Sequence, residues 1–197
     1  YLGDTPETFT YEGKEYTPQS FAKSLDLNLD DYVELTSFEA FPFYKSIVLP
    51  IPDNWLHGQY YNLPIDELME VMNNALKNGY SVCWDGDVSH NGFSHPSGLA
   101  ILPTDNPEEM INAEIDKWTT LSEKERKSKL QSFESPVPEM KVDDAKRQFT
   151  FNNRQTTDDH LMHITGLLKD HNGTLYYKTK NSWGDERSEF GGYLYMS

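Results

Sequence analysis

The chain of 197 residues carries 17 basic and 32 acidic side chains, which gives a net charge of −15. Because phosphate binding needs a basic surface, nucleic acid is excluded as an expected partner. No run of about 18 apolar residues occurs, so no membrane-spanning helix and no membrane partner are expected. Hydrophobic residues reach 37% and aromatic residues 13%, which predicts a folded domain with its own core.

The N-terminal quarter predicts only short elements. Residues 1–20 favour short strands around a turn at Glu12-Gly13. Pro18 favours the start of a short helix that continues over residues 19–25. The prolines farther along restrict "YKSIVLPIP" to a short edge or barrel strand.

The clearest helix is predicted in "LPIDELMEVMNNALKNGY". Pro64 suits its first helical position, the acidic residues that follow favour the positive end of the helix dipole, and Gly79 suits its end. An apolar stripe recurs at three- and four-residue spacing and predicts a core-facing side: Ile65, Leu68, Met72, Ala75 and Leu76. "YSVCWDGDVS" follows directly and alternates like a strand, whereas "NGFSHPSG" is expected to form a surface loop, with the alternative that it borders a substrate cleft.

The second half divides into a charged and a β-rich part. Residues 104–135 predict helix, beginning near Asn106-Pro107 and restarting where Ser122 and Glu125 have the spacing of a capping box. "ESPVPEM" is expected to be a linker. From Phe149 onward the pattern changes to strands, with three β-prone runs: "HLMHITGLL", "TLYYKTKNS" and "GGYLYM".

Two polar residues stand at the ends of the first two β-prone runs. His160 begins one run and Asn181 ends the next, so antiparallel pairing about their midpoint places them directly opposite each other, with Cβ atoms about 5 Å apart. A two-residue turn at Asn172-Gly173 would move them about 13 Å apart. We therefore predict a longer loop over Lys169–Gly173.

These runs resemble a known family. "DDHLMHITG…YYKTKNSWG…FGGYLYM" is similar to the C-terminal half of a papain-like cysteine peptidase, in which a histidine opens one barrel strand and Asn-Ser-Trp-Gly closes the next. The opening "YLGDTPETFTYEGKEYTP", the segment "ALKNGYSVCWDGDVS" and the acidic insert before His160 look closer to the bleomycin hydrolase and aminopeptidase C branch.

The resemblance implies a fold and a domain division. The fold would be α+β, a papain-like cysteine proteinase fold, mostly its antiparallel β-barrel half with helical insertions. Residues 1–197 would be the C-terminal part of a papain-like peptidase domain, with a helical insertion at about 104–148 and barrel strands carrying the histidine and asparagine over 149–197.

The resemblance also implies roles for single residues. His160 matches the catalytic histidine, Asn181 the residue that orients it, and Trp183 the indole that shields their hydrogen bond from water. The implied reaction is peptide-bond hydrolysis by a thiolate–imidazolium pair, of the aminopeptidase type that removes N-terminal residues. The expected partner is a peptide substrate, without cofactor or metal. His163 points to the other face of its strand from His160, so a two-histidine metal site is not expected.

The chain departs from the family at the nucleophile. The family's cysteine begins a helix after an oxyanion-hole glutamine in the N-terminal half, and neither segment is present in this sequence. The single cysteine, Cys83, excludes an internal disulfide, lies in a strand-like segment and is expected to be a buried core thiol. A missing N-terminal half is therefore expected to carry the nucleophile, and this chain alone is expected to be inactive.

Several alternatives remain open at this point. The chain could be a non-catalytic papain-like binding domain that lacks the nucleophile, or a structural barrel in which His160 and Asn181 are an ordinary hydrogen-bonded pair. Since the sequence begins at Tyr1, any targeting signal is expected to lie upstream. The resemblance alone favours a cytoplasmic location, with export left open, and is compatible with a homo-oligomer.

Overall fold

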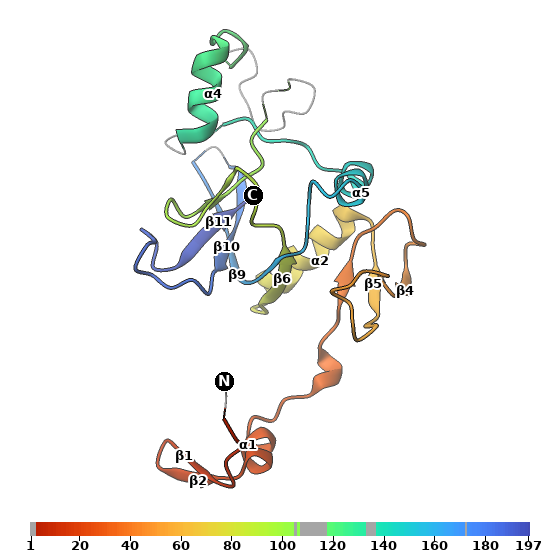
Figure 1. Cartoon of the computed structure of the whole chain (residues 1–197), viewed down its shortest axis with the longest axis vertical. Coiled ribbons are helices and arrows are strands. Elements are labelled where there is room, and N and C mark those ends of the chain that lie inside the picture. The colour runs from red at the N-terminus through yellow and green to blue at the C-terminus, as the bar shows by residue number, and fades with distance from the viewer. Residues whose placement is uncertain (1–2, 105, 107–117, 133–136, 172) are drawn as a thin grey trace.

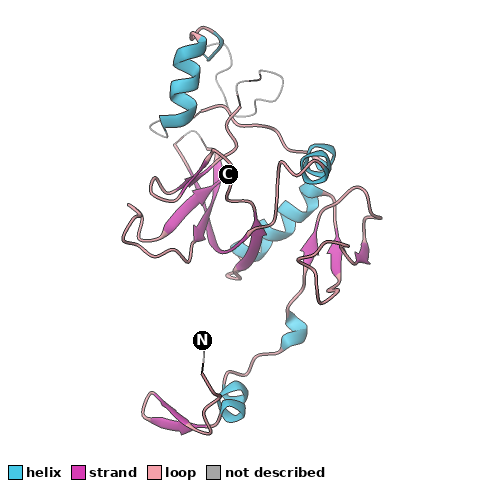
Figure 2. Cartoon of the chain, viewed as in Figure 1, coloured by secondary structure: helices cyan, strands magenta, loops and turns pink. Residues whose placement is uncertain are grey.

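The computed structural model describes residues 3–104, 106, 118–132, 137–171 and 173–197. The described residues form a main body around a six-stranded sheet, a three-stranded sheet beside it, and an N-terminal unit that an extended segment connects to the rest (Figure 1). The described helices stand between groups of strands that pair mostly antiparallel, so the α+β class is confirmed (Figure 2).

The N-terminal unit is a small hairpin with one helix. Strands β1 (Phe9–Tyr11) and β2 (Lys14–Tyr16) pair through the predicted turn, in which Glu12 and Gly13 have φ values of 50° and 77°. Helix α1 (Pro18–Ser24) begins with a capping box between Thr17 and Ser20. The ring of Phe21 packs edge-on against three aromatic rings of the hairpin, those of Phe9, Tyr11 and Tyr16.

A short 3-10 helix, η1 (Leu29–Asp31), leads to the small sheet β3-β5-β4. Its strands are β3 (Leu35–Thr36), β4 (Lys45–Ile47) and β5 (Tyr60–Asn62). Strand β4 lies at the edge of this sheet, as predicted. The fully buried Asn62 side chain accepts a hydrogen bond from the Phe38 amide and donates to three carbonyls, those of Phe38, Phe41 and Pro42.

The predicted long helix is α2 (Ile65–Lys77), and the predicted strand after it is β6 (Val82–Gly86). Pro64 is the N-cap residue of α2, with ψ 147°, and not its first helical residue, which corrects the sequence prediction by one position. Because proline has no N–H to donate, it fits either position at a helix start. Gly79 follows the helix with φ 84°, the left-handed conformation expected after a helix.

The central sheet has the strand order β6-β9-β10-β11-β8-β7. The remaining strands are β7 (Phe93–Ser94), β8 (Leu99–Ala100), β9 (His160–Lys169), β10 (Leu175–Lys180) and β11 (Tyr193–Met196). The three predicted β-prone runs are β9, β10 and β11, and they pair antiparallel in chain order. Strand β8 pairs parallel to β11, so the sheet is mixed.

One face of this sheet is buried. Ile164 on β9 and Thr179 on β10 are fully buried, and the Tyr177 hydroxyl on the same face donates a 2.9 Å hydrogen bond to Asn73 of α2. Helix α2 also contacts β9 and β6. The opposite face of β9 is open, because Leu161 and His163 are exposed. Helix α2 therefore covers the buried face of β9, and the opposite face of this strand is exposed.

The charged segment contains α4 (Glu123–Ser132) and α5 (Asp144–Asn152). The capping box at Ser122 and Glu125 is confirmed by reciprocal hydrogen bonds of 2.8 and 3.4 Å. The predicted start at Asn106-Pro107 cannot be compared, because residues 107–117 lie outside the described ranges. Helix α5 continues to Asn152, so the β-rich part begins later than residue 149.

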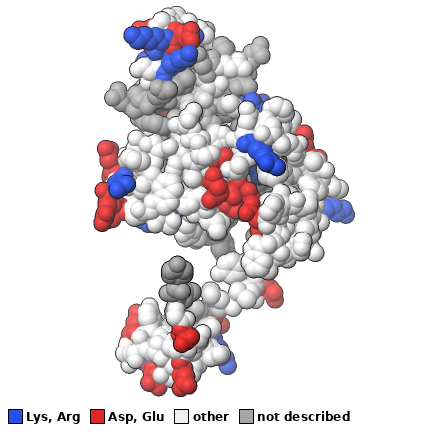
Figure 3. Space-filling model, in the orientation of Figure 1, with Lys and Arg blue, Asp and Glu red and all other residues white. Residues whose placement is uncertain are grey.

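The surface carries the acidic excess in groups, one of which lies near the middle of the main body in Figure 3. Among the helices of the described ranges, none combines the length and the apolar character needed to cross a membrane.

Strand β9 offers a test of this layering. Ile164→Ala should lower the free energy of unfolding by about 2–5 kcal/mol, because it opens a cavity under α2. Leu161→Ala on the exposed face of the same strand should change it by less than about 0.5 kcal/mol. Denaturant unfolding measures both, and equal effects of the two substitutions would contradict the assignment of the buried face.

Candidate functional site

The two predicted site residues meet at one end of the central sheet. His160 is the first residue of β9, and Asn181 directly follows Lys180, the last residue of β10. The His160 Nε2 atom lies 2.9 Å from Asn181 Oδ1, a hydrogen-bond distance. The predicted contact between these side chains is therefore present.

The strand register differs from the prediction. Lys180 pairs with His163, so Asn181 continues the ladder level with Met162 and lies diagonal to His160. A β-bulge at Thr165, between the pairs of Lys178 and Thr179, shifts the register by one residue. Diagonal neighbours on one face of a sheet are within reach of long side chains, so the hydrogen bond forms without direct opposition.

The loop between the two strands is longer than a two-residue turn, as predicted, but it is displaced by one residue. The Asp170 amide closes the loop by donating a 3.0 Å hydrogen bond to the Thr174 carbonyl. The Asp170 carboxylate accepts a further hydrogen bond, of 2.8 Å, from the Thr174 amide. Gly173 within the loop has φ 88°. The loop and the bulge together set the register that brings His160 to Asn181.

The Asn181 side chain is held on both its oxygen and its nitrogen. It is 1% exposed. Besides its contact with His160, the Oδ1 atom accepts a 2.7 Å hydrogen bond from the Ser182 amide. The backbone N–H of Asn181 donates to the Gly192 carbonyl at 3.0 Å, and Gly192 has φ 78° with no room for a side chain beside the Gly184 carbonyl. The amide oxygen is thus aimed at the histidine.

The structure adds His95, which lies in the segment for which the sequence predicts a surface loop. His95 begins the turn between β7 and β8 and is 6% exposed, so this part of the segment is buried. Its Nδ1 lies 3.2 Å from Asn181 Nδ2, and its Nε2 lies 3.2 Å from the Gly184 carbonyl oxygen. No local spacing could indicate this contact, since 86 residues separate His95 from Asn181.

Trp183 covers the two imidazoles. Its ring centroid lies 5.0 Å from that of His160 at 42° and 5.4 Å from that of His95 at 70°. Phe93 packs edge-on against the same indole at 5.7 Å. The indole remains 53% exposed, so it forms an outer wall over the hydrogen-bonded groups and is not part of the core.

Cys83 does not take part in this arrangement. It is exposed, which corrects the expectation of a buried core thiol. Strand β6 is covered on one face only, and Cys83 points to the other, paired with the exposed His163. Residues alternate between faces along β9, so His160 and His163 lie on opposite faces of the sheet and the thiol is away from His160.

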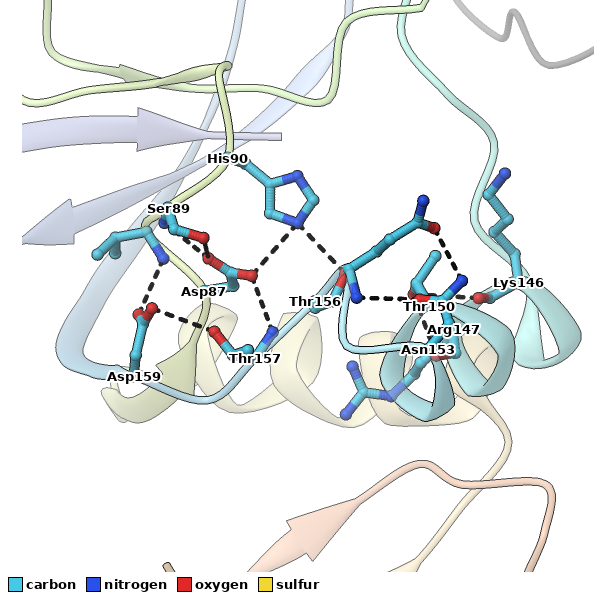
Figure 4. A network of polar contacts seen from close by, with 12 residues as sticks. Asp87, Ser89, His90, Lys146, Arg147, Thr150, Asn153, Thr156, Thr157 and Asp159 are labelled. Carbon is cyan, nitrogen blue, oxygen red and sulfur yellow. Dashed lines mark hydrogen bonds and ion pairs between the residues drawn. The ribbon is translucent and has the colours of Figure 1, made fainter.

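A polar network holds the segment just before His160 (Figure 4). The Asp87 carboxylate, after β6, accepts hydrogen bonds from the Thr157 amide at 2.8 Å and from the Ser89 amide and hydroxyl at 2.6 Å. The Asp159 carboxylate accepts from the Val88 amide at 3.2 Å. These contacts join the loop after β6 to the segment that leads into β9, and so fix the position of His160 at the start of that strand.

The pKa values of Asp87, in the network, and of Asp85, which precedes it on β6, are shifted in opposite directions. Burial alone would raise the pKa of Asp87, but the hydrogen bonds from Ser89 and Thr157 outweigh it and lower the pKa below its ordinary value. The pKa of Asp85 is raised, first by burial and then by the negative charges of Asp158 and Asp53. The fold thus favours the charged form of Asp87 and disfavours that of Asp85.

The described residues contain no group of three or more His, Cys, Asp or Glu side chains that could hold a metal ion. What they do bring together is an imidazole, an amide and an indole. A buried amide that accepts a hydrogen bond from one ring nitrogen of a histidine, and leaves the other ring nitrogen free of it, can orient an acid–base group.

Two comparisons with known proteins find similar chains, and no protein-family model matches. The chain is 25% identical over 204 aligned residues to aminopeptidase G of Lactobacillus delbrueckii subsp. lactis, covering 96% of this chain and 40% of that protein. It also matches the crystal structure of PepW from Lactobacillus rhamnosis, with a TM-score of 0.64 and 22% identity, over 100% of this chain and 41% of that one.

The comparisons confirm the resemblance to an aminopeptidase that the sequence indicated. The structural match shows that the fold is one found in PepW. The chain spans about two fifths of the length of both relatives, which are 40% and 41% covered.

The Asp87 carboxylate in the network of Figure 4 is expected to stabilise the fold. Asp87→Ala should lower the free energy of unfolding at pH 7 by about 1–3 kcal/mol, because it leaves the Thr157 and Ser89 amides without an acceptor. Asp4→Ala, at an exposed acidic position of the N-terminal unit, should change it by less than about 0.5 kcal/mol.

The Asp87 effect should depend on pH with a defined sign. A carboxyl whose pKa is lowered on folding stabilises the protein above the ordinary carboxyl pKa of about 4, and this stabilisation is lost as the pH falls through the lowered value. The difference between wild type and Asp87→Ala in denaturant unfolding should therefore shrink below about pH 4. A difference that grows on acidification would contradict the ionised state of Asp87.

Proposed function

We propose that the protein hydrolyses peptide bonds as a cysteine-type aminopeptidase, in which this chain supplies His160 as the general acid–base and Asn181 as the residue that orients it. The observation that carries the proposal is the 2.9 Å hydrogen bond between His160 Nε2 and the buried Asn181 amide oxygen. Within the described residues, the other ring nitrogen of His160 makes no hydrogen bond and is available for proton transfer.

The proposed reaction needs an imidazolium beside a thiolate. The thiolate sulfur attacks the peptide carbonyl carbon, and the tetrahedral intermediate collapses as the C–N bond breaks. His160 gives its Nδ1 proton to the leaving amine. It then takes a proton from the water that attacks the thioester and keeps it as the S–C bond breaks, so that the sulfur leaves as a thiolate and the starting thiolate–imidazolium pair is restored.

A neutral asparagine suits this cycle. Its amide oxygen accepts the Nε2–H of His160 in both the charged and the neutral state of the ring, so the ring keeps its orientation through the reaction. Trp183 lies against the His160 ring at 5.0 Å. We assign to it the role of keeping water from the hydrogen bond, which would otherwise weaken in a high-dielectric environment.

The nucleophile of this proposal lies outside the 197 residues. Cys83 is the chain's single cysteine, and it points from the face of the sheet opposite to His160. This chain by itself is therefore expected to be inactive. The aminopeptidase type rests on the similarity to aminopeptidase G, and the papain-like barrel half rests on the order of β9, β10 and β11 around the two site residues.

A non-catalytic papain-like binding domain is the second candidate. The placement of Cys83 favours it, because this chain holds the His160–Asn181 pair but its single thiol lies on the other face of the sheet. The two candidates differ in one observable feature of the full-length protein. A peptidase requires a reactive cysteine facing His160, whereas a binding domain does not.

Substitution of His160 tests the proposal. In the full-length protein, His160→Ala should lower kcat on aminoacyl-coumarin substrates by about 10²- to 10⁴-fold, since it removes the acid–base group. His163→Ala, an exposed histidine on the opposite face of the same strand, is the matched control and should leave kcat unchanged. Hydrolysis that survives His160→Ala would support a purely structural role for the pair.

A further inference from the structure

We propose that His95 is a positioning residue for the reaction. It acts through Asn181, by holding the asparagine amide in the one orientation that presents its oxygen to His160. This inference rests on the proposed function, because it concerns the same site. His95 belongs to the turn between β7 and β8, two strands that β10 and β11 separate from β9 in the sheet.

The polarity of the contacts follows from the groups involved. The Gly184 carbonyl can only accept, so the His95 Nε2 atom, 3.2 Å away, must carry the proton. In the neutral ring Nδ1 is then a bare acceptor. The facing atom of Asn181, at 3.2 Å, must be its NH₂ group, which leaves the amide oxygen to accept Nε2–H from His160.

The same polarity follows from the other end of the contact. The Ser182 N–H can only donate, and it lies 2.7 Å from the Asn181 Oδ1 atom. Two independent backbone groups, the Gly184 carbonyl and the Ser182 amide, therefore require the same amide orientation. The His160 ring is thereby fixed with its Nε2–H toward the amide oxygen and its Nδ1 atom directed away from the amide.

The turn that holds His95 is itself anchored. Its first and last residues close a 3.2 Å backbone hydrogen bond, from the Gly98 amide to the His95 carbonyl. The Gly98 carbonyl accepts from the Tyr195 amide of β11 at 2.8 Å. Gly98 has φ 64°, and a side chain there would collide with the Phe190 ring. His95 is also 6% exposed, so little freedom remains for the ring.

The location of His95 lets it position Asn181 without contacting the substrate. His95 faces Asn181 and lies under Trp183, so it does not reach a substrate that approaches the free side of His160. Its loss should lower kcat and leave KM nearly unchanged. A merely structural role would instead lower stability and act whether or not the Asn181 amide is present.

A double-mutant cycle in the full-length protein tests the proposal. His95→Leu should lower kcat about tenfold, as expected when a hydrogen-bond partner of a site residue is lost. In the Asn181→Ala background the same substitution should cost less than about twofold, because the group through which His95 acts is gone. Equal losses in both backgrounds would overturn the proposal.

Rescue by a conservative variant gives a second measurement that does not depend on the folding of the double mutant. His95→Asn can place an amide oxygen where Nδ1 stood and accept from Asn181, so its kcat should lie within about threefold of wild type. If His95→Asn is as impaired as His95→Leu while both melt at the wild-type temperature, the proposal fails. His163→Leu is the matched control and should have wild-type kcat.

The outcomes separate this inference from the proposed function. If His160→Ala retains full activity, the proposed function fails, whatever His95 does. If His160→Ala abolishes activity but His95→Leu keeps the wild-type kcat, only the role of His95 is wrong. The same holds if the whole effect of His95→Leu is an increase in KM.

Discussion

The arrangement of this site depends on one buried side-chain amide. Asn181 is 1% exposed and uses its oxygen for His160 and the Ser182 amide, and its nitrogen for His95. A primary amide has one accepting and one donating end, so the groups on either side must have opposite polarity. A buried amide without these partners would be costly, and the fold supplies one from each of three places along the chain.

The rest of the main body brings those three places together. Helix α2 lies against the face of the sheet on which Tyr177 and Thr179 are buried, and Asn181 continues that row. The bulge and the loop after β9 bring His160 diagonal to it. The parallel pairing of β8 with β11 places the β7–β8 turn, with His95, at the same end of the sheet. Long-range pairing therefore builds a site whose residues are far apart in sequence.

Local patterns sufficed where the governing interactions are local. The apolar stripe of α2, the capping box before α4 and the three β-prone runs are all periodic or short-range signals, and the structure contains each of them. The His160–Asn181 contact was also accessible, because both residues flank one hairpin. Its register was not predicted, because it depends on the bulge at Thr165, for which the only local indication is the glycine that follows at 166.

The failures share a physical cause. The exposure of Cys83 depends on which face of β6 is covered, and a short strand next to a helix does not show this in its own sequence. His95 lies in a segment with turn composition, and its buried ring contacts residues far along the chain: Asn181, Trp183 and Gly184. Tertiary pairing decides both cases, and a single sequence carries no direct record of it.

The central claim is that the His160–Asn181 pair serves a thiol that lies outside these 197 residues. The most direct measurement is alkylation of the full-length protein with iodoacetamide, with the modified cysteine identified by mass spectrometry and the rate compared with that of His160→Ala. The account predicts that loss of activity follows modification of a cysteine other than Cys83, and that His160→Ala slows this modification at neutral pH by removing the imidazolium partner. Inactivation that follows modification of Cys83, at a rate independent of His160, would contradict it.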